Sequence, residues 1–353
     1  RRVLAFGHSF FYLGPVDMPI ARAEVLFTHA SAFQPNKFAN TAEIVGAFRQ
    51  DRHSGVLGAL GARAEMVPVS VAVRSLGEDH RIRKERTFRF HVFVHQKWTP
   101  YLMMVTLFNS IAGLNDFMEE STFRLSGKVE LEGQPHLELN TMQASGELPV
   151  PAPMLLAGWW GDKFNRLFLN AVKMPRLKSV EATVDLLPER RVATIESAWI
   201  PASEVEPGQE LTIRAFLRPY RGPRLEREFQ LRIPAGLARG EHRILLSDAD
   251  TLNRIESSAG FMNRFIDLPQ AVSLINRERS NNCLYVSLVQ GRPTYFYDDK
   301  TLPSLPPSVV NLMQTGRAAA RTLASSAESV VEQTAIAFDY VITGSYSLKI
   351  QVR

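Results

Sequence analysis

Apolar residues in this sequence gather in short runs that alternate with polar positions and are separated by turn residues. The run TFRFHVFVHQ, at 87–96, shows the pattern most clearly, because every second position is apolar: Phe88, Phe90, Val92 and Val94. Successive side chains of a strand point to opposite faces, so this alternation predicts a β-strand with one buried face. Similar runs recur along the whole chain and predict a mainly β protein.

Three stretches carry a helical pattern instead. Tyr101–Met118 is a long, largely apolar stretch without proline, and Asp267–Glu278 begins with an N-cap aspartate and a proline suited to the first turn. The third stretch, Pro153–Val172, repeats apolar side chains at helical spacing: Leu156, Trp160, Phe164, Leu167, Phe168 and Ala171. This stripe predicts a helix that docks on the rest of the fold by one face.

The pattern divides the chain into four regions. Residues 1–78 hold short, glycine-rich strands typical of part of a small barrel, and residues 79–178 form a β-rich module with helices. Residues 179–256 repeat short alternating strands at the spacing of an immunoglobulin-like β-sandwich, and residues 257–353 mix helices and strands. We therefore expect a partial barrel followed by β-rich modules, including a sandwich, with a few helices.

Composition narrows the class of protein. The 353 residues are 45% hydrophobic and 22% charged, the balance of a globular protein. The net charge is +5, but the densest basic stretch, His80–Arg86, is short and contains Glu85, so we expect no nucleic-acid partner. The longest apolar stretch, Tyr101–Leu114, is too short and too polar to span a bilayer. Cys283 is the only cysteine, which excludes an intrachain disulfide.

Metal and cofactor chemistry find little support in the sequence. His91 and His95 fall on the same face of one predicted strand, but four residues separate them by ~13 Å, too far for one metal ion without ligands from other elements. No phosphate-binding or dinucleotide-binding glycine motif occurs. We therefore expect neither a metal nor a cofactor.

Two stretches near the start carry a more specific signal. Residues 5–19 read AFGHSFFYLGPVDMP, and residues 38–69 contain the segment TAEIVGAFRQDRHSG. They resemble the SpoIVB-type serine peptidase family, named after the stage IV sporulation factor B. That family shows a G-H-P-F-x-x-x-G-P-x-x-x-P-like stretch around its histidine, followed by T-G-x-x-G-x-x-x-Q-D-R-x-x-G. A softer likeness to the tail of longer bacterial members lies at Glu204–Gly222.

The resemblance implies peptide-bond hydrolysis by a serine mechanism on a chymotrypsin-like double β-barrel, with His8 as general base and no cofactor. An imidazole exchanges protons near neutral pH, which suits that role. A serine triad also needs a carboxylate that fixes the imidazole tautomer, and Asp51 and Asp17 are both candidates. As purely structural alternatives, Asp51 would pair with Arg52 in a turn, and Asp17 would cap a proline-rich turn.

The nucleophile is missing from the sequence. The family carries it in a G-M-S-G-S-P-like motif, and the serines at Ser126, Ser145 and Ser345 lack that pattern. Ser9 also stands where the family has proline after the histidine. We expect the serine segment to precede the histidine in a longer polypeptide, and this chain alone to be inactive.

Two functions remain open at this point. The first is a serine endopeptidase that acts on protein or peptide substrates outside the bacterial cytoplasm, in the periplasm, in the envelope or after secretion. The alternative is a catalytically inactive protein-binding module of the cell envelope. The sequence leaves the oligomeric state open.

Overall fold

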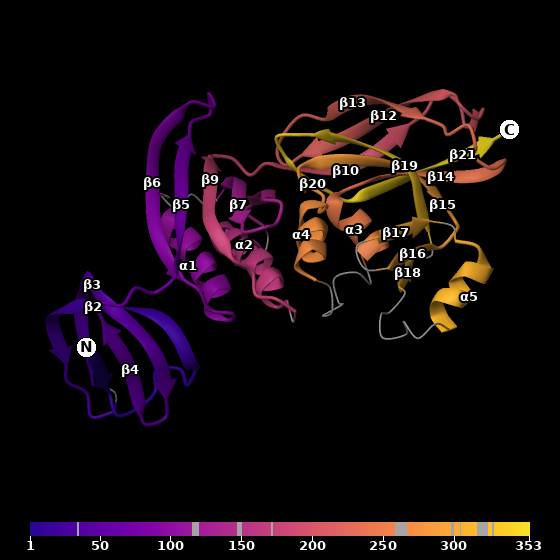
Figure 1. Cartoon of the computed structure of the whole chain (residues 1–353). Helices are drawn as coiled ribbons and strands as arrows, with labels where there is room; N and C mark the ends of the chain where they lie inside the picture. Colours follow the sequence, from indigo (N-terminus) through magenta and orange to yellow (C-terminus); the bar gives the residue numbers. More distant parts are fainter. Residues whose placement is uncertain are drawn as a thin grey trace.

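The computed structural model describes residues 1–33, 35–114, 120–146, 150–170, 172–257, 267–297, 300–303, 305–315, 324–326 and 328–353. Strands dominate these residues, as the alternating pattern predicts, and they form several separate sheets (Figure 1). The chain runs from an N-terminal sheet through a sheet covered by helices to a β-sandwich. No helix among the described residues has the length and apolar character that crossing a membrane requires.

The N-terminal sheet is a half-barrel of four antiparallel strands. Its strand order is β1 (Arg2–Ala5), β4 (Gly55–Leu60), β3 (Asn36–Arg52) and β2 (Gly14–His29). Strands β2 and β3 remain paired as far as His29 and Asn36, well beyond the end of β4, so residues 21–29 and 36–44 form a two-stranded arm. Glycine allows close approach within the sheet, because a Cβ on Gly58 would lie 2.4 Å from Ile20 Cδ1.

The second unit is a five-stranded sheet with two helices packed on one of its faces (Figure 1). Its strand order is β6 (Ile82–Phe93), β5 (Met66–Leu76), β9 (Leu177–Leu187), β7 (Thr122–Leu131) and β8 (Leu137–Ala144), and its helices are α1 (Trp98–Ala112) and α2 (Ala152–Phe168). The apolar stripe of α2 is buried against this sheet, with Trp160 and Phe164 at the centre of the core. The predicted docking face is thereby confirmed, but the helix ends at Phe168 rather than at the expected Val172, and Ala171 lies outside the described residues.

The third unit is a β-sandwich built from two sheets. One sheet has the order β13 (Leu225–Arg232), β12 (Glu210–Pro219), β10 (Val192–Trp199), β20 (Val341–Thr343). The other has the order β11 (Glu204–Val205), β21 (Ser345–Val352), β14 (Gly240–Ser247), β15 (Cys283–Gln290), β19 (Ser329–Ala337). Side chains from both sheets, such as Ile213 and Val286, share one core.

Further elements lie beside the sandwich and between it and the second unit (Figure 1). They are the helices α3 (Ala249–Ser257), α4 (Leu268–Asn276) and α5 (Pro307–Thr315), and a small sheet of β17 (Lys300–Pro303), β16 (Thr294–Tyr297) and β18 (Ala324–Ser326). The expected N-cap of α4 is confirmed, because Asp267 and Gln270 form a reciprocal capping box. Helix α4 packs into the core of the second unit, beside α2.

The sheets divide the chain at other points than the expected boundaries at 78, 178 and 256. Strand β5 lies in the second unit, where it pairs in parallel with β9, and β9 therefore belongs to this sheet rather than to the sandwich. Strands β15, β19, β20 and β21 complete the sandwich from the last region of the chain. The differences arise because these pairings join strands far apart in sequence, which a local pattern does not reveal.

Two local expectations also need correction. The strand around Phe90 ends at Phe93, so His95 lies beyond it and shares no strand with His91. The helix expected at Tyr101–Met118 begins earlier, at Trp98, and ends at Ala112; residues 115–119 fall outside the described part of the chain.

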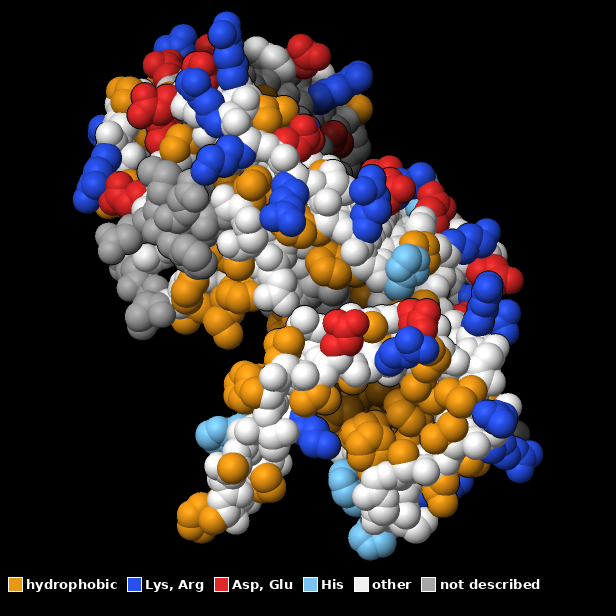
Figure 2. All heavy atoms as spheres, turned by 90° about the vertical axis from the view of Figure 1, so that its left-hand side faces the viewer, with side chains coloured by type: hydrophobic (Ala, Val, Ile, Leu, Met, Phe, Trp, Pro, Cys, Tyr) orange, Lys and Arg blue, Asp and Glu red, His pale blue; other side chains and the backbone are white. Residues whose placement is uncertain are grey.

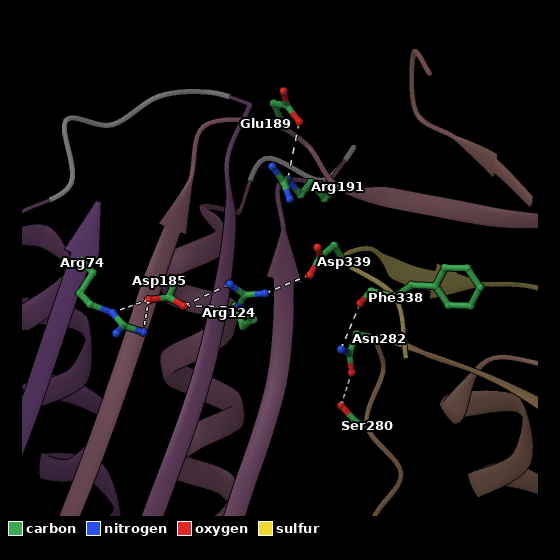
Figure 3. A network of polar contacts seen from close by, with 9 residues as sticks. All are labelled: Arg74, Arg124, Asp185, Glu189, Arg191, Ser280, Asn282, Phe338 and Asp339. Carbon is green, nitrogen blue, oxygen red and sulfur yellow. Dashed lines mark hydrogen bonds and ion pairs between the residues drawn. The ribbon is translucent and has the colours of Figure 1, made fainter. Parts of the chain in front are cut away.

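Polar contacts join the second unit to the sandwich (Figure 3). Asp185 on β9 is nearly buried and binds Arg74 on β5, with an N–O distance of 2.7 Å, and Arg124 on β7, at 3.3 Å. Arg124 also reaches across to Asp339 of the sandwich, at 3.0 Å. Beside this network, Asn282 donates a hydrogen bond to the carbonyl of Phe338.

Candidate functional site

His8 lies in the loop between β1 and β2, at one end of the half-barrel. Its side chain is exposed to solvent. The loop is conformationally unusual, because Phe6 and Tyr12 have φ angles of 75° and 57°, in the left-handed region that non-glycine residues rarely adopt. Backbone strain of this kind persists only where the surroundings hold it, and it concentrates at functional sites.

The imidazole of His8 makes one short contact, of 2.8 Å, between its Nδ1 and the backbone oxygen of Ser9. A carbonyl oxygen only accepts hydrogen bonds, so Nδ1 must carry the proton and donate it. In the neutral ring the lone pair then lies on Nε2. This is the tautomer in which Nε2 can accept a proton from a nucleophile, as a general base does.

Asp51, near the end of β3, lies under this loop and is only 2% exposed. Its Oδ1 accepts a hydrogen bond from the N–H of Phe10, at 2.8 Å. Its Oδ2 accepts from the N–H groups of Phe11, at 2.8 Å, and Leu13, at 3.3 Å. The carboxylate therefore holds the segment that follows His8 by its backbone.

These hydrogen bonds determine the ionisation of Asp51. Burial acts to raise the pKa of its carboxyl, but the N–H groups of Phe11, Phe10, Leu13 and Tyr12 stabilise the anion more strongly, so the pKa is lowered. The structural alternative for Asp51, a pair with Arg52, does not describe its contacts, because Arg52 donates to Gln50 instead.

Asp17 occupies a different position, within strand β2 and not in a turn. Its Oδ1 forms an ion pair with Arg49, and its Oδ2 accepts a hydrogen bond from the backbone N–H of Glu65, at 2.9 Å. Asp17 thus ties the half-barrel to the segment that leads into the second unit. The hydrogen bonds of Asp17 and Asp51 go to groups other than the His8 ring, so neither carboxylate orients that ring by direct contact.

Aromatic side chains fix the loop to its surroundings. The Phe10 ring packs edge-on against Phe48 of β3, with centroids 5.8 Å apart, and the Phe11 ring packs on Trp98 at the start of α1, at 4.4 Å. Sequence reasoning missed both contacts. The alternation of the strands gives no sign of them, although the FF pair directly after His8 and Ser9 is unusual for a solvated loop.

The half-barrel is open on its apolar side. Figure 2 shows apolar side chains lining a hollow in the lower part of the molecule, where the N-terminal sheet lies. The exposed large apolar residues of this unit and its loops are Leu4, Phe6, Phe10, Phe11, Tyr12, Val25, Leu26, Phe27, Phe33, Phe38, Ile44 and Leu60. The three core clusters of the described residues begin at Val67, so none of them lies in this sheet.

The serines considered from the sequence lie in other units. Ser126 is in β7, Ser145 follows β8, and Ser345 begins β21. None of these three lies in the N-terminal sheet, whose β1–β2 loop carries His8. The structure therefore does not bring any of them together with the histidine by strand pairing. Within the described residues, no group of three or more His, Cys, Asp or Glu side chains is placed to hold a metal ion.

Comparison of this chain with protein-family models, with curated proteins and with solved structures finds no match.

Proposed function

We propose that this chain forms one part of a SpoIVB-type serine endopeptidase, with His8 as general base. The observation that carries the proposal is the exposed His8, with the lone pair of its neutral ring on Nε2, beside a half-barrel that leaves many large apolar side chains exposed among the described residues. Exposed apolar side chains that gather in a hollow, as Figure 2 shows, mark an interaction site. Sheets reach stability by burying such a face against another layer.

The proposed partner of this surface is a serine-bearing polypeptide outside these 353 residues. It would close the half-barrel and bring a serine hydroxyl to the Nε2 side of His8. His8 would then take the hydroxyl proton during attack on the peptide carbonyl and return it to the leaving amine. The substrates in this proposal are proteins or peptides outside the bacterial cytoplasm, and no cofactor takes part.

A second candidate is an inactive protein-binding module of the cell envelope. The observation that favours it is the engagement of Asp51 and Asp17 with other groups, which leaves the imidazole without a directly bound carboxylate. In that case the apolar half-barrel would bind its partner for assembly alone.

Labelling with a serine-directed fluorophosphonate separates the two candidates. The protein to use is the polypeptide extended upstream in the gene so that it includes a serine motif. We expect labelling of this protein and its loss in His8→Ala, whereas His29→Ala, which removes another histidine of the same sheet, should label normally. Undiminished labelling of His8→Ala would remove His8 from the mechanism.

The remaining outcomes are equally informative. No labelling of the unaltered extended protein favours the binding module. The 353-residue chain alone should be inactive, because a base without a nucleophile offers no acyl-enzyme route. Turnover by this chain that disappears when one internal serine is replaced would contradict the proposal.

A further inference from the structure

One peptide group lies between Asp51 and His8. The bond that joins Ser9 to Phe10 presents its N–H to Asp51 Oδ1, at 2.8 Å, and its C=O to His8 Nδ1, also at 2.8 Å. A trans peptide group is planar, and its N–H and C=O point in opposite directions. The carboxylate and the imidazole therefore bind the two ends of one rigid unit.

We propose that Asp51 is a positioning residue that controls the tautomer of His8 through the peptide group between Ser9 and Phe10. The inference rests on the proposed role of His8 as a base, and it assigns a task to the one carboxylate buried beside that residue. In a serine triad the carboxylate contacts the imidazole directly. Here a peptide group stands between them and transmits both orientation and charge.

Orientation is transmitted because Asp51 fixes the peptide plane. Two further N–H groups, from Phe11 and Leu13, bind the same carboxylate, so the segment cannot rotate about one hydrogen bond alone. The left-handed φ angles of Phe6 and Tyr12 show that the loop adopts a strained path, which needs such anchoring. With the plane fixed, the Ser9 carbonyl points at Nδ1 and favours a proton there.

Charge is transmitted because hydrogen bonds in a chain polarise one another. A carboxylate that accepts from the Phe10 N–H draws positive charge to that end of the peptide group and increases the negative charge on the Ser9 oxygen. The oxygen becomes a better acceptor for the Nδ1 proton. The loop shields Asp51 from solvent, so water screens its charge less than that of an exposed carboxylate.

The test is the tautomer of His8, measured by nitrogen-15 NMR on the 353-residue chain at a pH where the ring is neutral. In the unaltered chain we expect the Nδ1–H tautomer to dominate at His8, with the exposed His29 as internal reference. Asp51→Asn should abolish this preference, because a neutral amide cannot accept from three N–H groups. The matched control Asp17→Asn should leave it unchanged.

Two results would overturn the inference: an Nε2–H tautomer at His8 in the unaltered chain, or an unchanged tautomer in a folded Asp51→Asn chain. If that variant does not fold, the tautomer of His8 in the unaltered chain still decides the inference, and acid titration of that chain tests the anchor on which it depends. The lowered pKa of Asp51 keeps the carboxylate ionised below its ordinary value of 3.8. The amide signals of Phe10, Phe11 and Leu13 should therefore shift together only below that pH, and separate transitions would contradict the shared anchor.

This readout is independent of peptidase activity. A tautomer that responds to Asp51→Asn, together with an extended protein that fluorophosphonate does not label, would uphold the coupling and reject the proposed function. Labelling that requires His8, together with a His8 tautomer that does not respond to Asp51→Asn, would uphold the proposed function and reject the coupling.

Discussion

Asp51 and His95 use the same device, since each is a side-chain acceptor that gathers neighbouring backbone N–H groups. His95 Nδ1 accepts from the N–H groups of Lys97, at 3.1 Å, and Trp98, at 3.3 Å, where helix α1 begins. The N-cap residue of α1 is Lys97, and its side chain makes no capping hydrogen bond to these N–H groups. His95 therefore accepts the hydrogen bonds that the N-cap side chain accepts in most helices.

The capping role of His95 predicts a dependence of stability on pH. Burial, with a smaller effect of the Lys97 charge, lowers the pKa of His95. A lowered pKa means that the folded state prefers the neutral ring, so this contribution is complete above the ordinary value of 6.5 and is lost as the pH falls through the folded-state pKa. His95→Ala should reduce the free energy of unfolding by about 1 kcal/mol at pH 8.

Urea unfolding at pH 8 and pH 5 checks this prediction. The His95→Ala chain should lose less stability between the two pH values than the unaltered chain. His91→Ala serves as the control, because His91 is exposed on β6, and it should change neither quantity. Equal effects of the two substitutions would show that His95 does not cap the helix.

At the scale of elements, the contact between β7 and α2 depends on a missing side chain. A Cβ on Gly127 would lie 2.6 Å from the ring of Trp160, which is fully enclosed in the core and cannot move aside. Gly127→Ala should therefore lower the free energy of unfolding by about 1–3 kcal/mol through overpacking.

Gly158, on the exposed side of α2, provides the matched control. A Cβ there would meet nothing within 4 Å, so Gly158→Ala should raise the free energy of unfolding by about 0.5–1 kcal/mol through helix propensity. Chemical denaturation of both variants gives the comparison. A Gly127→Ala chain as stable as the unaltered one would mean that the helix and sheet pack less tightly than described.

The sequence indicated individual elements better than their partners. Alternation located the strand at 87–96, and spacing located α2, because both signals are local. The pairing of β5 with β9 was not foreseeable, since paired residues such as Val69 and Val180 lie 111 positions apart in the chain. At the site, the motif singled out His8 and Asp51, but the contact of Asp51 with backbone N–H groups depends on a loop path that residue types do not encode.

For the whole molecule, the joint between the second unit and the sandwich depends on side chains that bind an edge strand. Asn281 accepts from the N–H of Met142, at 2.9 Å, and donates to its C=O, at 2.6 Å, where β8 ends the sheet. Asn281→Ala should lower the free energy of unfolding by about 1–3 kcal/mol, because the backbone groups of the buried Met142 lose their partner.

Asn140→Ala is the control for the joint, because that side chain is exposed on the same strand. Differential scanning calorimetry compares the stability of the two variants, and Asn281→Ala should be the less stable one. If Asn281→Ala behaves like Asn140→Ala, the joint does not depend on these hydrogen bonds.

The half-barrel has no core cluster among the described residues, whereas the other two units each have a buried hydrophobic core. Many of its large apolar side chains are exposed, although Ala47 and Val56 are buried. Its two-stranded arm, residues 21–29 of β2 and 36–44 of β3, extends beyond the rest of the sheet. An isolated two-stranded hairpin is marginally stable in water, so this part should be the least protected of the molecule. The proposed function requires that the serine-bearing polypeptide covers the half-barrel and raises its protection from hydrogen exchange.

Hydrogen exchange of the backbone amides in β2, β3 and β4 tests that requirement most directly. The measurement compares the 353-residue chain with the polypeptide extended upstream to include the serine motif. We predict that exchange in these strands slows by roughly tenfold or more in the extended protein, while exchange in β12 and β14 stays the same. Equal exchange of β2, β3 and β4 in the two proteins would contradict the claim that the half-barrel is one part of a composite peptidase site.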